Sequence, residues 1–255
     1  MARFDLSDAE WQIVEPLLPN KPRGVARADD RRVLNGIFYI LRTGSPWRDL
    51  PERYGPYTTV YNRFNRWAKA GVWLNVFNAL AERSPESMAF IDSSIIRAHQ
   101  HAAGRKKGGP DNAIGLSRGG LSTKIHAVVD EAGLPIRLSL TAGQASDKAA
   151  APALVDSLKT AAHVVADRGY DALSLVEQIR SRGAEAHIPT QRNRKAQRSV
   201  NRAIYSQRNL VERYFNKLKH FRRIATRFDK LARNYLAAVA IASVRLWTRA
   251  YESTT

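Results

Sequence analysis

Apolar side chains recur at helical spacing through the first 86 residues of the chain. Ser7 with Glu10 three positions later is typical of a capping box, which begins the first of these helices. The apolar pattern predicts four helices in this part, over residues 7–18, 29–42, 57–70 and 72–83. We therefore expect residues 1–86 to form an all-helical module.

The third of these helices has two different faces. Val60, Phe64 and Trp67 fall on one side, and we expect Arg63 and Arg66 to lie elsewhere around the helix. An apolar inner face with polar and basic side chains outside is typical of a recognition helix in a helix-turn-helix domain. The pattern also fits a surface helix of a bundle. We predict a helix-turn-helix-like module in which Arg63 and Arg66 contact DNA.

The pattern changes after residue 86 to short apolar runs separated by turns and helices. A DEAG turn between two of the runs indicates a hairpin, and residues 102–121, rich in Gly and basic residues, read as a loop. The predicted strands cover residues 88–91, 123–129, 134–140, 163–166 and 184–188. The predicted helices cover residues 147–158, 172–182, 201–220 and 234–251. This order predicts an α/β fold, a five-stranded mixed sheet flanked by helices.

The predicted helix over residues 201–220 carries an unusual set of polar side chains. Tyr205, Arg208, Glu212 and Lys219 are spaced so that all four project from one stripe roughly 60° wide on a continuous α-helix. A carboxylate among basic and phenolic groups is a poor choice for a buried core. The stripe instead suits a phosphate backbone beside a metal ion.

Three carboxylates are candidates for one metal site. Asp92 and Asp167 each follow a predicted buried strand, and functional groups of α/β sheets collect at the carboxyl ends of strands. Glu212 can join them from a helix packed over that edge. Oxygen ligands without cysteine favour Mg²⁺ or Mn²⁺ over zinc, and a pair of such ions suits phosphodiester chemistry. Asp171 is an alternative second ligand, which we interpret as the cap of the helix that follows.

Charge points to a polyanionic partner. The chain has a net charge of +18, and residues 192–233 alone hold 14 basic and 2 acidic side chains. Clustering of this kind is typical of nucleic-acid binding and predicts strongly salt-dependent affinity. The chain has no cysteine, no long uncharged apolar run and no apolar leader at its N-terminus. These absences fit a cytoplasmic protein with no membrane partner.

The spacing Y-x2-R-x3-E-x6-K from Tyr205 to Lys219 resembles the signature of the IS4/IS5-type DDE transposases. Further resemblance is carried by FIDSSIIRAH around Asp92, VVADRGYDA around Asp167, and LSDAEW, GSPWRDLP and TVYNRFNRW in the first 86 residues. It extends over nearly the whole chain and is closest to the IS5 family. With 45 positions between Asp167 and Glu212, there is no room for the insertion domain of larger relatives, so their DNA hairpin chemistry is not expected here.

The resemblance implies a particular enzyme. It implies an RNase H-like catalytic domain over residues 87–255, preceded by a DNA-binding domain over residues 1–86. Asp92, Asp167 and Glu212 would be the catalytic and metal-binding triad, supported by two Mg²⁺ ions that Mn²⁺ can replace. The expected partners are double-stranded DNA (terminal inverted repeats and target) and a second copy of the chain in a dimeric synaptic complex. The setting would be the bacterial cytoplasm, in association with the nucleoid.

The basic side chains of the C-terminal part are the expected DNA contacts. For Arg208, four residues before Glu212, an ion pair with that carboxylate is an alternative to a phosphate contact. The predicted DNA contacts besides Arg63 and Arg66 are Tyr205, Arg208, Arg213, Lys217, Lys219, Arg222 and Arg223.

Three histidines and two other functions stay open at this point. His99 and His101 are spaced as a weak metal pair or as exposed loop residues, and His126 fits either a structural or a site role. A nuclease of the same fold that cleaves without strand transfer shares most of these features. A repressor that binds DNA without catalysis shares the charge but has no need of the triad.

Overall fold

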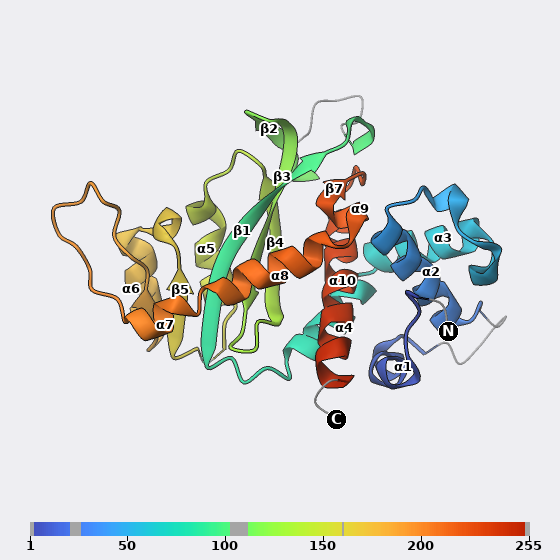
Figure 1. Cartoon of the computed structure of the whole chain (residues 1–255), viewed down its shortest axis with the longest axis horizontal. Helices are drawn as coiled ribbons and strands as arrows, with labels where there is room; N and C mark the ends of the chain where they lie inside the picture. Colours follow the sequence, from blue (N-terminus) through green and yellow to red (C-terminus); the bar gives the residue numbers. More distant parts are fainter. Residues whose placement is uncertain (1–2, 21–26, 103–111, 160, 253–255) are drawn as a thin grey trace.

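The computed structural model describes residues 3–20, 27–102, 112–159 and 161–252. A helical module and a mixed sheet lie on either side of a long C-terminal helix, α10 (Figure 1). No helix within the described ranges is long and apolar enough to cross a bilayer.

The helical module forms as the apolar pattern predicts. The predicted capping box is present, because the Ser7 hydroxyl accepts from the Glu10 amide at 3.1 Å and the Glu10 carboxylate accepts from the Ser7 amide at 2.8 Å. Short 3₁₀ turns (η1 Glu15–Leu17, η2 Trp47–Asp49, η3 Glu52–Tyr54) extend or connect the helices. The helices are α1 Asp8–Val14, α2 Asp30–Thr43, α3 Tyr57–Lys69 and α4 Val72–Ala81.

The predicted mixed sheet is confirmed, but it has seven strands among the described residues where we predicted five. Strands β1, β5 and β6 pair in parallel, and β1–β3, β2–β3 and β3–β4 pair antiparallel. The two additional strands are β2, within the predicted loop over residues 102–121, and β7, which pairs in parallel with the last two residues of β1. Of that loop, residues 103–111 lie outside the described residues. The strands are β1 Met88–Ala98, β2 Gly115–Ser117, β3 Gly120–Val129, β4 Pro135–Ala142, β5 His163–Ala166, β6 Glu185–His187 and β7 Thr226–Arg227.

Strand β1 is longer than predicted, which corrects the position of Asp92. The sequence indicated a strand that ends at Ile91, because the polar residues Asp92, Ser93 and Ser94 follow. In the structure β3 pairs with β1 from Phe90 to Arg97, so the ladder of hydrogen bonds continues through the polar segment. Asp92 therefore lies inside the strand and not at its end.

The helix predicted over residues 201–220 is interrupted. Helix α7 ends at Ser206 and α8 begins at Asn209, with a turn at Gln207 and Arg208. The Leu210 amide donates to the Gln207 carbonyl and the Val211 amide to the Arg208 carbonyl, which are three-residue spacings that tighten the chain. The prediction of one continuous helix is therefore wrong, because Tyr205 lies on a different helix from Glu212 and Lys219.

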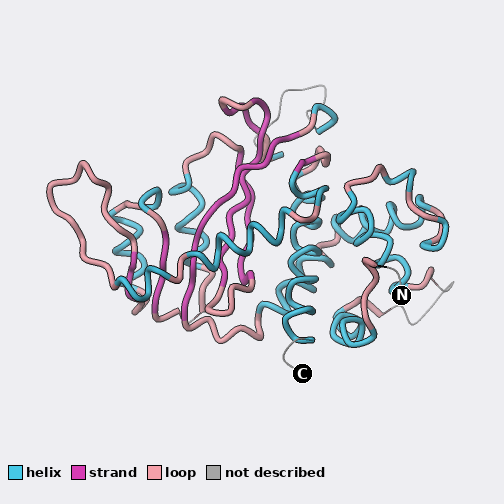
Figure 2. Tube along the Cα trace, in the orientation of Figure 1, coloured by secondary structure: helices cyan, strands magenta, loops and turns pink. Residues whose placement is uncertain are grey.

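The remaining helices cover the sheet and connect it to the helical module. Helix α8 crosses one face of the sheet, over β1 and β3, and α9 and β7 follow it toward the module (Figures 1 and 2). The 3₁₀ turns η4 (Gln100–Ala102) and η6 (Arg168–Tyr170) follow β1 and β5. The helices are α5 Asp147–Asp156, α6 Leu173–Ser181, α7 Arg202–Ser206, α8 Asn209–Lys219, α9 Arg222–Ala225 and α10 Ala232–Glu252.

Helix α10, predicted over residues 234–251, joins the two parts into one core. It packs against α1, α2, α3 and α4 on one side and against β4 and α8 on the other. Glu10, only 2% exposed, receives an ion pair at 3.1 Å from Arg245 of α10. A hydrophobic core without a break therefore extends from the first helix to the sheet.

Candidate active site and DNA-facing surface

Asp92 of β1 and Asp167, the residue directly after β5, lie side by side. Ile91 of β1 pairs with Ala166, the last residue of β5, so the next residue along each segment is one of the two aspartates. The side chains of Ile91 and Asp92 point to opposite faces of the sheet, and that of Asp92 lies on the face that α8 crosses. The pairing register of two buried strands therefore brings the two carboxylates together.

Glu212 approaches the same place from α8, with Arg208 between the carboxylates. One guanidinium nitrogen of Arg208 donates to Asp92 Oδ2 at 3.4 Å, and another donates to Glu212 Oε1 at 2.5 Å. The ion pair with Glu212, which we left open as the alternative to a phosphate contact for Arg208, is therefore present. Because the same side chain also reaches Asp92, it links α8 to β1 across the site.

The other two carboxylates act on the acidity of Asp92. Burial, together with the charges of Asp167 and Glu212, raises the pKa of Asp92 to about 6, against lowering by the Ser93 amide and Arg208. The Asp92 side chain is 20% exposed and the Glu212 side chain is 49% exposed. The site is thus a partly open group of negative charges with one cation of its own.

These three carboxylates do not form a closed ligand set with Arg208 in place. Among the residues that the structure describes, a group of three ligand atoms within 4.8 Å of one another occurs only at His163, Glu185 and His187. In the acidic site, the guanidinium of Arg208 occupies space between Asp92 and Glu212. An ion would compete with this side chain for both carboxylates.

Asp171, the alternative second ligand, has another role. It is fully buried and binds Arg194 at 2.9 Å, a second guanidinium from Arg198, and the Gln191 amide at 2.9 Å. It does not cap the following helix, whose N-cap residue is Ala172, so that interpretation was wrong. Asp171 anchors the basic loop after β6, and all its oxygens are committed to that loop.

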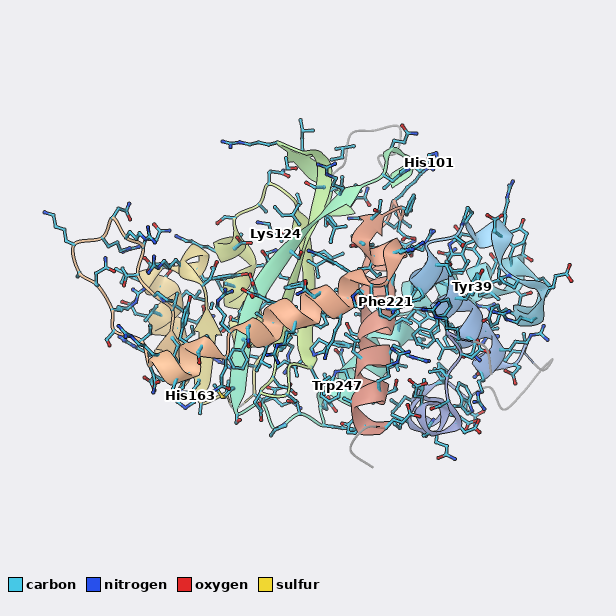
Figure 3. The ribbon with its side chains drawn as sticks, viewed as in Figure 1. Tyr39, His101, Lys124, His163, Phe221 and Trp247 are labelled. Atoms are coloured by element: carbon cyan, nitrogen blue, oxygen red, sulfur yellow. The ribbon has the colours of Figure 1, made fainter. Side chains whose placement is uncertain are left out.

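The opposite face of the sheet holds a polar network that the sequence did not reveal. The Ser93 hydroxyl donates to Asp147 Oδ1 at 2.5 Å, and Lys124 Nζ lies 2.9 Å from the same carboxylate (Figure 3 labels Lys124). His126 is fully buried, with its Nε2 atom 2.8 Å from the Thr141 hydroxyl, which gives it a structural environment. The only sequence signal for this network was the alternation of polar residues on two strands.

The predicted DNA contacts divide into exposed and buried side chains. Arg63 is only 3% exposed and pairs with Asp30, with its guanidinium 4.9 Å from the Trp67 ring, so the expectation that it faces outward is wrong. It lies three residues after Val60 and four before Trp67, within the buried stripe. Arg223 is 9% exposed and its guanidinium lies 5.5 Å from the rings of both Trp47 and Phe228. The exposed members are Arg66, Arg213, Lys217, Lys219 and Arg222, and Tyr205 and Arg208 are half-buried.

A groove lies between the exposed face of α3 and the far end of β1. Its volume is about 1030 Å³, and aromatic and basic side chains from both parts of the chain line it. His99 and His101, in ring contact at 4.6 Å, belong to this groove, and His99 also stacks on Phe228. The principal lining side chains are Trp47, Arg48, Tyr57, Tyr61, His101 and Arg223.

Comparison with known proteins identifies two family matches. Residues 6–77 match a family described as "Putative transposase of IS4/5 family", and residues 83–247 match the "Transposase DDE domain". The chain is 38% identical over 130 residues, 51% of its length, to all of the "Putative transposase for insertion sequence element IS6501" of Brucella ovis. It is 38% identical over 122 residues, 42% of its length, to 82% of an uncharacterized 16.2 kDa protein of insertion element IS402 from Burkholderia cepacia. Among solved structures, the piggyBac transposase synaptic complex with hairpin DNA aligns over 98% of this chain and 74% of that chain, with a TM-score of 0.45 and 10% identity.

Proposed function

The chain belongs to the IS4/IS5-type DDE transposases, and we propose that Asp92, Asp167 and Glu212 are its catalytic carboxylates. Its function is that of a DNA transposase of an insertion sequence, which uses a divalent metal. The observation that carries the assignment is the convergence of three carboxylates from β1, the end of β5 and α8 on one face of the sheet. We assign to it metal-dependent cleavage at terminal inverted repeats, followed by joining of the freed 3′ hydroxyls to target DNA.

The residues present fit a hard divalent cation. The raised pKa of Asp92 means that the carboxylate is short of compensating charge, which a cation supplies. All three ligands are carboxylate oxygens, the donors that Mg²⁺ and Mn²⁺ prefer. Asp92, Asp167 and Glu212 would hold two such ions, which would supply activation of the attacking oxygen and stabilisation of the leaving oxygen of a phosphodiester.

The other side chains have roles in holding DNA and the site itself. Arg208 holds Asp92 and Glu212 in the free protein and is placed to turn to a phosphate once a cation neutralises them. Lys219 and Arg213 are exposed on α8 and supply phosphate contacts. The aromatic and basic groove beside α3 supports a second stretch of DNA contact, in which Tyr57 and Tyr61 take the part predicted for Arg63.

Domain roles and assembly follow from the same proposal. We assign DNA-end recognition to residues 1–86 and catalysis to residues 87–255, a division supported by family matches that end at residue 77 and begin at residue 83. Transposition pairs two DNA ends, so we propose a dimer of this chain in the synaptic complex. The same proposal implies that the protein associates with the bacterial nucleoid.

The decisive experiment is a cleavage assay on the DNA that flanks the gene. Wild type with Mg²⁺ or Mn²⁺ is expected to nick defined end positions, and EDTA is expected to abolish the nicks. Glu212→Gln is expected to bind the same DNA but not cleave it, whereas Glu177→Gln, an exposed acid on α6, is expected to behave as wild type. Equal loss of binding and cleavage in Glu212→Gln would count against its assignment.

The same assay separates the alternative functions. Products in which a cut end is joined to a second DNA identify a transposase, and nicks without joined products identify a nuclease of the same fold. Binding without cleavage under either metal identifies a repressor or an inactive copy.

A further inference from the structure

A second group of ligand atoms lies on the sheet away from the carboxylates. His163 is the first residue of β5, and Glu185 and His187 are the first and last residues of the neighbouring strand β6. The parallel register pairs His163 with Glu185 and Val165 with His187, so the three side chains share one face. Four residues separate His163 from Asp167, about 13 Å along an extended strand, so this group is distinct from the acidic site.

The three atoms form an almost equilateral triangle. His163 Nδ1 and His187 Nε2 are 3.1 Å apart, and Glu185 Oε2 lies 3.5 Å from the first and 3.6 Å from the second. A single point about 2.0 Å from all three atoms exists near the plane of this triangle, and zinc binds imidazole nitrogen and carboxylate oxygen at about 2.0–2.2 Å. The atoms are therefore already at the separation that a shared ion requires.

We propose that His163, Glu185 and His187 bind one transition-metal dication, with Zn²⁺ as the best fit. Two imidazoles and one carboxylate are typical ligands of zinc, whereas Mg²⁺ prefers oxygen ligands alone. Glu185 is 64% exposed and His163 is 33% exposed, so an ion can enter from solvent and keep a water as its fourth ligand. His187 is 1% exposed, and its burial favours the neutral ring that binds metal.

The position of the site indicates what bound metal does. Strand β6 is three residues long and stands at the end of the order β2-β3-β1-β5-β6, with β5 as its neighbour there. A shared ion fastens this short strand to β5 with two ligands on one strand and one on the other. The basic loop anchored by Asp171 begins just after β6, so the metal also fixes the start of that loop. Figure 3 shows His163 far from His101.

The test is zinc binding by the full chain, freed of any affinity tag and stripped with EDTA. A chromogenic zinc indicator is used as competitor at pH 7.5, and thermal unfolding is followed with and without Zn²⁺. Wild type is expected to take up one Zn²⁺ in competition with the indicator and to gain a few degrees in Tm, because the ion binds the folded state. An excess of Mg²⁺ is expected to leave the Zn²⁺ uptake and the Zn²⁺-dependent gain in Tm unchanged.

Four variants decide where the ion binds. Glu185→Gln changes an exposed side chain and leaves the fold intact, and it is expected to weaken Zn²⁺ affinity at least about tenfold, as is His163→Gln. His220→Gln, at an exposed histidine outside the cluster, and Glu212→Gln, in the acidic site, are expected to bind Zn²⁺ as wild type does. Wild type that takes up no Zn²⁺ overturns the proposal, and so does equal Zn²⁺ affinity in wild type and Glu185→Gln.

Discussion

The two faces of the sheet at β1 hold carboxylates in opposite ways. On the face under α8, Asp92 lies beside Asp167 and shares the single guanidinium of Arg208 with Glu212. On the other face, Asp147 accepts from the Ser93 hydroxyl and pairs with the Lys124 ammonium, which also donates to the Ala145 carbonyl. Adjacent residues of one strand, Asp92 and Ser93, therefore belong to two different environments.

The difference is visible in the acidity of the two groups. Burial and neighbouring carboxylates raise the pKa of Asp92 to about 6. Burial also acts on Asp147, but the hydrogen bond from Ser93 and the charge of Lys124 outweigh it and lower its pKa. A carboxylate with its own donors contributes to stability, whereas carboxylates crowded around too few donors fit the cation site that we propose. Asp171 likewise has donors of its own, in Arg194 and Arg198.

The largest expected effect comes from replacing the carboxylate on each face of the sheet by a neutral amide. Asp92→Asn is expected to reduce metal-dependent cleavage on the order of 10³-fold, because it removes one of the three proposed metal ligands. Asp147→Asn is expected to cost about 2 kcal/mol of unfolding free energy, because Lys124 loses its partner, with cleavage within about threefold of wild type. Cleavage time courses and urea unfolding measure the two effects. A folded Asp147→Asn protein as inactive as Asp92→Asn would remove the distinction between the faces.

A pH titration of stability tests the structural face separately. Burial lowers the pKa of His126 to about 4, below the value of about 6.5 in the unfolded chain. The unfolded state therefore takes up this proton first, so the contribution of His126 to stability is present above pH 6.5 and is lost as pH falls toward 4. Between pH 7 and pH 5 the loss is about 2 kcal/mol.

The control for that titration is a second histidine substitution. Urea unfolding at several pH values is expected to show a flatter pH dependence for His126→Gln than for wild type. His220→Gln, at an exposed histidine, is expected to keep the wild-type slope. Parallel slopes in wild type and His126→Gln would mean that His126 protonates equally in both states.

How far the sequence predicts this molecule depends on whether local pattern or tertiary pairing decides. The capping box at Ser7 and helix α10 follow from local pattern, and both were predicted correctly. Strand β1 was predicted too short, because its polar half is held by pairing with β3, which no local pattern reports. The proximity of Asp92 and Asp167 was predictable from strand topology, although the resemblance to known transposases was needed to choose these two acids.

Other errors arose from side-chain partners that are distant in sequence. Arg63 was predicted to face DNA from its residue type, although its spacing from Val60 and Trp67 already placed it in the buried stripe. Its partner Asp30 lies on α2, and the partners of Asp171 lie on a later loop. The break at Gln207 and Arg208 carries no Pro or Gly, so nothing in the local sequence announced it. It leaves Arg208 at the N-cap of α8, in reach of both carboxylates.

The smallest expected effect concerns the side chain between the carboxylates. Arg208→Gln removes the cation that competes with metal, so Mn²⁺, used as a paramagnetic substitute for Mg²⁺, is expected to bind about tenfold tighter without DNA. Cleavage is expected to fall nonetheless, because Arg208 no longer turns to a phosphate. Arg213→Gln makes the same charge change on an exposed residue of α8 and is expected to leave Mn²⁺ affinity unchanged. Loss of the free Mn²⁺ resonance signal measures the affinity, and equal affinities in the two variants would show that Arg208 acts by net charge alone.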